Sequence, residues 1–566
     1  MGPMRFNTSR LLSLPLAAII GLAGCDDDGG TGPVVLNPPA GVTAVATGPT
    51  TVRVTWNQVA NAEGYEVDRA PDQGAFATVE TGLAATFFED DGLVEGTAYR
   101  YRVRAVKGSV LSANSGEVEV LTGTGGPKLR VINGVTQNTT LRADSVYVLS
   151  GFVKVSNGAT LTIEPGTRIV GDTLAPGSSL WVLRGSRLIA EGTAENPIVF
   201  TSQRAAGSRR PGDWGGIVII GNAPINRTAN PIFTEGPTGA AENYAGGTDF
   251  DDDSGSLKYV RIEFAGYDVS NGAGQELNGL SSYAVGRGTE YDYVQVMSGL
   301  DDSFEFWGGG VDVRHLVSYE AGDDHFDWSE GYRGRGQHLI ALQTTVPTPR
   351  PGSGTVSSDP RGFEGDGCES DKAGCTYANQ PTSQPVWANF TVVGPGAGIF
   401  SSTDGNGAVI RRGSGGTLVN GIIARWPGVG ISIRDAESGA LLADDSLTVR
   451  GIVLAGNGSN FEAAASGRFG HLVQQNATAW KVQEAAINTL FSTLPTSTSN
   501  PTTIDWAPAA GSAAATGGLG DFTGTSIAGR VQGFFGGAMP ATAYAGAADP
   551  AAAEGWWEGW TVFIRD

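Results

Sequence analysis

The sequence predicts an all-β protein in which a small antiparallel sandwich precedes a long right-handed parallel β-helix. Glycine accounts for 85 of the 566 residues and only 17% of residues are charged, as in proteins built from short strands and tight turns. Short apolar runs bounded by Gly, Asn or Pro-Gly return along residues 128–566 at intervals in the twenties. Such recurrence indicates a solenoid, in which each coil buries its face on its neighbours.

Residues 1–25 have the pattern of an export signal, in which two arginines precede an apolar run that ends in small residues and Cys25. The run is short for a spanning helix, and residues 26–36 are expected to form a flexible tether. Leu22–Cys25 resembles the lipobox of bacterial lipoproteins. That resemblance implies a lipid on Cys25 and an exported protein anchored to a membrane. The outer membrane or cell surface is favoured, and the choice of membrane stays open. An export signal or uncleaved anchor with an incidental cysteine is the alternative.

Residues 37–122 alternate apolar and polar side chains in several short runs separated by turn residues. This period of two predicts antiparallel strands with one buried face in each sheet. Trp56, Tyr65, Tyr99 and Tyr101 stand where a fibronectin type III domain has its core aromatic residues, and the segment resembles that family. The resemblance implies a spacer or binding module that performs no chemistry of its own.

Several phrases in residues 128–566, among them "GATLTIEPGTRIVG" and "WGGIVIIGNAPIN", resemble uncharacterised bacterial surface lipoproteins of the pectin-lyase-like β-helix superfamily. The resemblance implies a fold and a surface location, because this fold carries lyases, hydrolases, adhesins and inert stalks alike. The final residues 555–566 hold three tryptophans and are expected to cap the last open coil. A sorting or membrane-contact signal is the alternative.

Two acidic phrases in this region are 22 residues apart. Asp301-Asp302-Ser-Phe-Glu305 returns as Asp323-Asp324-His-Phe-Asp327. In a β-helix that interval places the members of each phrase side by side on adjacent coils, about 4.8 Å apart. Six carboxylates would then share one patch, with the two phenylalanines stacked between them.

Such a patch needs a counter-ion or bound protons, because like charges about 4 Å apart repel by about 4 kcal/mol at an effective dielectric near 20. Calcium accepts six to eight oxygen ligands at flexible geometry, and carboxylates on adjacent coils can supply them. We therefore expect Ca²⁺ as a cofactor, with the six acids as ligands. Two alternatives remain: the acids cap turns by accepting backbone N–H groups, or a transition metal binds with His325.

The Asp-Asp-x-x-Asp spacing resembles the calcium site of family nine pectate lyases, which implies Asp301 or Asp302 with Asp323, Asp324 and Asp327 as ligands. Those lyases use a lysine as the base that removes the substrate proton. Here Lys372 is the nearest downstream lysine, and Arg333 and Arg335 are weak substitutes because arginine resists deprotonation. This departure places a lyase activity in doubt.

Three classes of function remain open. A non-catalytic surface protein that binds a polysaccharide or another surface partner is favoured over a polysaccharide lyase and over a glycoside hydrolase, because no convincing base accompanies the acids. Four aromatic residues are candidates for stacking on sugar rings: Trp307, Trp328, Tyr332 and Trp387.

The net charge of −21 argues against nucleic acid and anionic membrane surfaces as partners, and permits cations or glycans bridged by a cation. Cys368 and Cys375 are the only cysteines besides Cys25. In an oxidising compartment we expect them to form a disulfide that closes a small loop, in preference to a two-cysteine metal site.

Overall fold

The computed structural model describes residues 35–48, 50–71, 74–122, 128–270, 272, 274–400, 405–493 and 504–563. The chain forms two compact units, Met1–Gly126 and Pro127–Asp566. Cys25 lies outside the described residues, so the lipid anchor stays a prediction. Within the described ranges, the helices are too short or too polar to cross a membrane.

The first unit is an antiparallel sandwich. Its strands are β1 (Thr43–Gly48), β2 (Thr51–Thr55), β3 (Gly64–Pro71), β4 (Ala77–Leu83), β5 (Phe87–Asp90), β6 (Ala98–Lys107), β7 (Val110–Leu111) and β8 (Val118–Leu121). One sheet has the order β1-β2-β5, and the other has the order β4-β3-β6-β7 with β8 also on β6. Buried and partly exposed residues alternate along β6, and Trp56 packs edge-on against Tyr65 at 5.3 Å. The predicted sandwich is confirmed.

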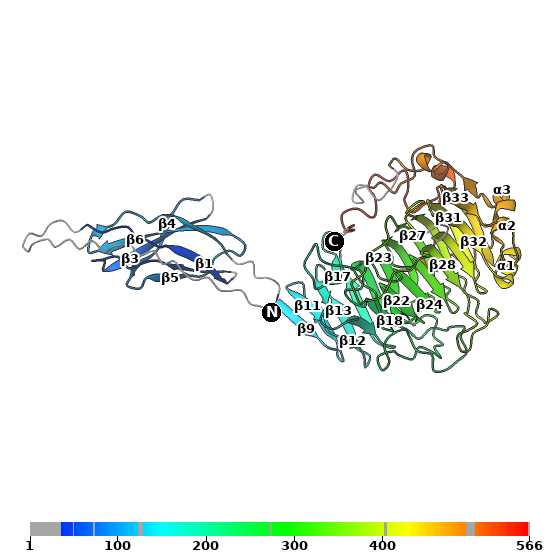
Figure 1. Cartoon of the computed structure of the whole chain (residues 1–566), viewed down its shortest axis with the longest axis horizontal. Helices are drawn as coiled ribbons and strands as arrows, with labels where there is room; N and C mark the ends of the chain where they lie inside the picture. Colours follow the sequence, from blue (N-terminus) through cyan, green and yellow to red (C-terminus); the bar gives the residue numbers. More distant parts are fainter. Residues whose placement is uncertain are drawn as a thin grey trace, which may run out of the picture. The chain divides into compact units, whose positions relative to one another are not determined.

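The second unit is a parallel β-helix with two long sheets, which run side by side in Figure 1. The ten-stranded sheet contains β12 (Phe152–Val155), β15 (Ser179–Val182), β18 (Ile217–Ile220), β22 (Leu280–Tyr283), β24 (Phe304–Trp307), β26 (Phe326–Ser329), β28 (Arg361–Asp366), β30 (Asn406–Arg411), β32 (Val429–Ile433) and β34 (Ser459–Phe461). The fifteen-stranded sheet contains β9 (Lys128–Ile132), β10 (Thr139–Leu141), β11 (Ser145–Leu149), β13 (Thr160–Ile163), β14 (Arg168–Gly171), β16 (Arg187–Glu191), β17 (Ile198–Ser202), β19 (Gly255–Glu263), β23 (Glu290–Met297), β25 (Asp312–Tyr319), β27 (Arg335–Leu342), β29 (Val386–Val393), β31 (Gly416–Ala424), β33 (Leu447–Ala455) and β35 (Gln483–Glu484). The predicted β-helix is therefore confirmed.

The remaining elements are short pieces outside the two long sheets. They are β20 (Tyr267–Asp268), β21 (Glu276–Leu277), β36 (Gln532–Phe534), β37 (Gly537–Ala538), α1 (Ala436–Ala443), α2 (Gly470–Gln475), α3 (Ala477–Trp480) and two 3₁₀ helices, η1 (Ile487–Thr489) and η3 (Ala514–Thr516). Side chains from α2 and α3, including Leu472 and Trp480, pack against the core of the β-helix.

The long strands of the fifteen-stranded sheet bend at residues in the left-handed conformation. Tyr259, Tyr293, His315 and His338 have φ values of 48°, 56°, 51° and 62° at equivalent positions of β19, β23, β25 and β27. Their rings stack in a column, with neighbouring centroids 4.4, 4.2 and 5.1 Å apart. The column marks one corner of the β-helix.

The C-terminal segment covers this aromatic column and does not cap the last coil. Trp560 packs edge-on against Tyr259 at 5.8 Å, and Trp556 lies 5.0 Å from the His315 ring. Gln295 of β23 also donates to the Val562 carbonyl at 2.6 Å, so the chain returns to the middle coils (Figure 1). The expected cap was therefore wrong, because Trp556 and Trp560 pack on aromatic rings of the middle coils.

Candidate metal centre

The pairing expected from the 22-residue interval is present between β24 and β26. Phe304 lies beside Phe326, and Glu305 lies beside Asp327. The two phenylalanine rings stack inside the coil at 5.5 Å. Because side chains alternate along a strand, the buried phenylalanines direct both carboxylates to the opposite, outer face.

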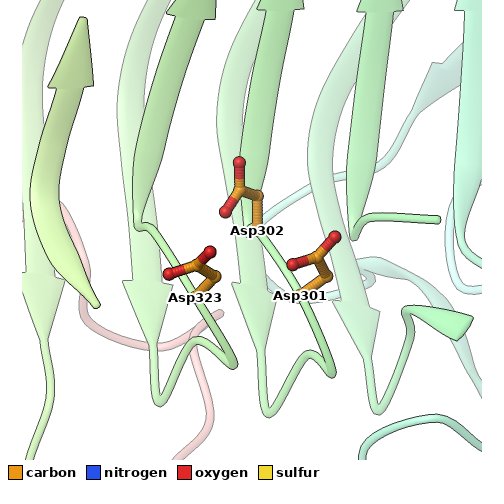
Figure 2. Close-up of side chains that lie close together, drawn as sticks. All are labelled: Asp301, Asp302 and Asp323. Carbon is orange, nitrogen blue, oxygen red and sulfur yellow. The ribbon is translucent and has the colours of Figure 1, made fainter. Parts of the chain in front are cut away.

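Two groups of carboxylates form at the start of these strands. Asp301, Asp302 and Asp323 make one group, and Asp302, Glu305 and Asp327 make the other, with one oxygen of each member within 4.8 Å of the others. Figure 2 shows the first group on two adjacent turns. Asp302 belongs to both groups and joins them into one acidic cluster.

Asp302 and Asp324 also hold adjacent coils together. Asp302 Oδ1 accepts the Asp324 N–H at 2.7 Å, and Asp324 Oδ1 accepts the Arg361 N–H at 2.6 Å. Asn278 accepts the Asp302 N–H in the same way at 3.1 Å, so the ladder continues one coil earlier. The alternative expectation, that these acids accept backbone N–H groups, therefore holds for one oxygen of Asp302 and one oxygen of Asp324.

Asp324 belongs to neither carboxylate group, so the structure does not place this expected ligand with the other five. Its second oxygen accepts from the Arg361 guanidinium at 3.1 Å, which leaves both oxygens occupied. His325 is also outside both groups, since its Nδ1 lies 2.6 Å from the Ser318 hydroxyl. Burial lowers the pKa of His325 to about 3, so the ring is neutral.

The cluster itself has no internal counter-charge. In the described part of the chain, no lysine or arginine forms an ion pair with Asp301, Asp302, Glu305 or Asp327. Asp327 is only 9% exposed, and its Oδ1 has no hydrogen-bond partner. Glu305 accepts one hydrogen bond, from Asn278 at 2.6 Å.

Burial raises the pKa values of these carboxyl groups, and repulsion between neighbours raises most of them further. Asp323 reaches about 7, where the nearby Arg361 partly offsets the effect of burial. The shift is upward and large for Asp301, Asp302, Glu305 and Asp327. Such groups either hold protons at neutral pH or require a bound cation.

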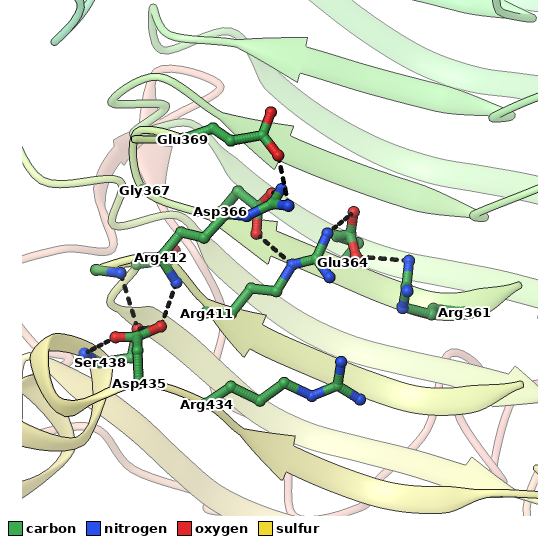
Figure 3. A network of polar contacts seen from close by, with 12 residues as sticks. Arg361, Glu364, Asp366, Gly367, Glu369, Arg411, Arg412, Arg434, Asp435 and Ser438 are labelled. Carbon is green, nitrogen blue, oxygen red and sulfur yellow. Dashed lines mark hydrogen bonds and ion pairs between the residues drawn. The ribbon is translucent and has the colours of Figure 1, made fainter. Parts of the chain in front are cut away.

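In the next coils, arginines neutralise the charge of the buried carboxylates. Arg361 pairs with Glu364, Arg411 bridges Glu364 and Asp366, and Arg412 pairs with Asp366 (Figure 3). Glu364 continues the outward row directly, because it lies beside Asp327 in the sheet. The row therefore changes from acids paired with arginines to acids without them at Asp327.

A cleft of about 360 Å³ opens beside the unpaired end of this row, lined among others by Glu305, Asp327, Glu235 and Glu276. Burial raises the pKa of Glu235 to about 8. Glu276 is on the β20–β21 hairpin and lines the cleft from there.

The disulfide loop forms another wall of the cleft. Cys368 and Cys375 are bonded, as expected, and Glu369 and Lys372 within their loop line the cleft. Lys372 lies 3.6 Å from the Glu369 carboxylate, and its side chain is 47% exposed. Lys372 is thus the one base candidate that the structure brings to the acids.

Neither arginine candidate faces this cleft. Arg335 donates to both oxygens of Asp312 and is 2% exposed, so it serves an ion pair. Arg333 is exposed and lines a different pocket, together with Arg335. The prediction of either residue as a base was wrong.

The sugar-stacking prediction was wrong for three of its four residues. Trp328, Tyr332 and Trp387 are at most 1% exposed and pack together in the core of the β-helix. Trp328 follows Phe326 by two positions, and the period of two places both inside. Trp307 lines the cleft and stacks face to face on Tyr283 at 3.9 Å, and only 8% of it is exposed.

Sequence reasoning missed Glu235 and the three arginines of the network. Glu235 comes from the long connection between β18 and β19, which no repeat interval could align with the acids. Arg411 and Arg412 carried a usable signal, because Arg411 is the last residue of the short apolar strand β30 and Arg412 follows it, and the partner strand β28 ends in Glu364-Gly-Asp366.

Comparison with known families places this site in a wider context. Residues 133–506 match the family model described as "Pectate-lyase like beta helix domain". The chain belongs to this family. Residues 37–120 match the fibronectin type III domain, which agrees with the sandwich of the first unit.

Three individual matches each cover a short stretch of this chain. A poly(3-hydroxybutyrate) depolymerase from Ralstonia pickettii is 43% identical over 68 residues, which is 12% of this chain and 13% of that protein. An Fn3-like protein from Clostridium thermocellum is 34% identical, covering 15% of this chain and 90% of its own, with a TM-score of 0.14. The structure titled FN3tt is 20% identical, covering 16% of this chain and 99% of its own, with a TM-score of 0.15.

Proposed function

We propose that the β-helix domain holds calcium at the acidic cluster and uses the ion to bind an anionic polysaccharide in the adjoining cleft. The observation that carries this proposal is the buried Asp327 carboxylate, which has an unpartnered oxygen and lines the cleft. Lipid anchoring through Cys25 would display the domain at the cell surface, with the sandwich as a spacer.

The donor set fits calcium better than a softer metal. All five members of the two groups are carboxylates, and hard oxygen donors suit calcium, whereas nitrogen and sulfur ligands suit zinc or copper. Asp301, Asp302, Asp323, Glu305 and Asp327 would hold the ion. A divalent cation would also neutralise charges that arginines neutralise in the following coils.

An anionic polymer suits the cleft because bound calcium can bridge protein and ligand carboxylates. Without the ion, the lining acids would repel such a ligand, and binding would then depend on the metal. Arg227, Lys372 and Arg412 also line the cleft and would contact the ligand's remaining charges.

Glycan-array binding by the purified protein tests this function directly. We expect binding of acidic polysaccharides such as polygalacturonate in calcium and loss of binding in EDTA. Asp327→Asn should lose binding, whereas Glu290→Gln, at an exposed position of β23 away from the cluster, should keep it. Binding that persists in EDTA, or that prefers neutral glycans, contradicts the proposal.

Lys372 in the cleft favours a second candidate, a calcium-dependent polysaccharide lyase. The bound ion would acidify the proton beside the uronate carboxylate, and the lysine amine would be the base. Incubation with polygalacturonate and calcium should then produce ultraviolet-absorbing unsaturated products, and Lys372→Ala should abolish them. Reducing ends released without that absorbance would indicate a hydrolase, and no products at all would leave the binding function.

A further inference from the structure

A second pocket, of about 370 Å³, gathers positive charge on a chain whose net charge is −21. Four arginines line it: Arg287, Arg333, Arg335 and Arg530. The pocket shares no lining residue with the acidic cleft. Its walls combine loops of the β-helix with the C-terminal segment around Arg530, which are far apart in the sequence.

Two of these arginines are held by neighbouring groups. Arg335 donates to Asp312 and to the backbone carbonyls of Gln532 and Gly533, so it fixes the C-terminal segment against the coil. Arg530 donates to the Thr417 hydroxyl at 3.1 Å and to the Ser446 carbonyl at 3.3 Å. Both of these acceptors are neutral, so the contacts do not compensate the positive charge of Arg530.

The other two arginines have guanidinium N–H groups without an acceptor. Arg333 is exposed, and its guanidinium has no partner among the described residues. Arg287 lies over the Phe250 ring at 4.7 Å, and its Nε is buried without an acceptor. Their backbones are fixed, because Arg287 N–H donates to the Phe250 carbonyl at 2.8 Å and Arg333 N–H to the Gly309 carbonyl at 2.9 Å.

The described lining of the pocket contains four guanidinium groups and no carboxylate. Asp312 pairs with Arg335, and the other carboxylates that influence these arginines are Asp251 beside Arg287 and Asp444 and Asp445 beside Arg530. Burial lowers the pKa of both Arg287 and Arg530, and a neighbouring guanidinium lowers each further. An anion in the pocket would relieve this repulsion.

We propose that this arginine pocket binds a tetrahedral oxyanion, a phosphate or a sulfate group, either free or as an ester on a glycan. Guanidinium forks match such groups because each presents two parallel N–H donors. Donors that approach from several loops suit an anion with three or more terminal oxygens better than a planar carboxylate with two. The site needs no calcium and goes beyond the function proposed for the acidic cleft.

Isothermal titration calorimetry in EDTA tests this site separately from the calcium-dependent function. Inorganic phosphate, inorganic sulfate and acetate are titrated into the full chain at one ionic strength set with sodium chloride, because screening changes all charged contacts. We expect saturable binding of phosphate or sulfate. Arg287→Gln and Arg333→Gln should each weaken it by about tenfold, the effect of losing one charge-assisted hydrogen bond.

Arg142→Gln is the matched control, because that side chain is 66% exposed in the same unit and does not line the pocket. It should leave the affinity unchanged. Dextran sulfate that competes with inorganic sulfate would identify the ester as a ligand, and failure to compete would assign the site to the free anion. No saturable binding, an equal loss in the control, or acetate binding as tightly as phosphate would overturn the proposal.

Discussion

Replacing Asp327 with asparagine tests whether this residue is a metal ligand or a buried acid without a metal. The change keeps the shape of the side chain and removes one charge from the group of Asp302, Glu305 and Asp327. At separations near 4.8 Å and an effective dielectric near 20, each charged pair repels by about 3 kcal/mol. Raised pKa values let some of these acids hold protons, so the relief at pH 7 is smaller, about 1–2 kcal/mol.

The sign of the effect should depend on calcium. In EDTA the Asp327→Asn variant should unfold at a higher temperature than the native protein, because less repulsion is buried. In excess calcium it should unfold at a lower temperature, because a ligand is missing. Calcium at about 100 times its dissociation constant stabilises a folded protein by about 2.7 kcal/mol, and the variant should lose much of that gain.

Thermal unfolding followed by circular dichroism, with and without calcium, measures both effects. Glu290→Gln is the control, since Glu290 is exposed and belongs to neither carboxylate group. Its midpoint should match that of the native protein in both conditions. A variant that unfolds below the native protein in EDTA as well as in calcium would refute the reasoning, because Asp327 would then stabilise the fold without a metal.

Three further outcomes follow from named contacts. In EDTA the free energy of unfolding should fall as pH rises from about 4 through 7, because Asp323, with a pKa of about 7, holds a proton in the folded state that the unfolded chain releases; calcium should reduce this fall in a pH series of thermal melts. Arg361→Gln should destabilise the protein by about 3–5 kcal/mol in urea titrations, because it leaves Asp324 and Glu364 buried without their shared partner; an unchanged midpoint would contradict this. Trp560→Ala should make the C-terminal segment more sensitive to limited proteolysis and should lower the melting temperature. A segment that stays resistant to protease in this variant would show that the aromatic column does not hold it.

The register between the two acidic phrases was predictable because they are separated by one coil. Phe304 and Phe326 are 22 residues apart, and no insertion lies between them, so the sequence interval equals the structural one. The next coil is longer, since Phe326 pairs with Phe363 across an insertion that follows β27. Glu364 therefore joins the row at an interval that no fixed repeat predicts.

The alternation of side chains along β26 could be predicted from the sequence, but which side faces the core depends on the whole fold. Phe326 and Trp328 flank Asp327, so a strand with Asp327 outside must place both aromatic rings inside. Contacts between distant segments had no comparable local signal. The docking of Trp560 on Tyr259 and the approach of Glu235 to the cleft depend on long connections whose paths only the folded chain defines.

Isothermal titration calorimetry of calcium into the metal-free protein measures the occupancy of the acidic cluster most directly. The native protein should bind calcium saturably with release of protons, and Asp302→Asn should abolish this binding, because Asp302 belongs to both carboxylate groups. The asparagine oxygen can still accept the Asp324 N–H, as Asn278 does for the preceding coil, so the variant should remain folded. Native protein that takes up no calcium, or a folded Asp302→Asn variant that binds it equally well, would contradict a metal centre at this cluster.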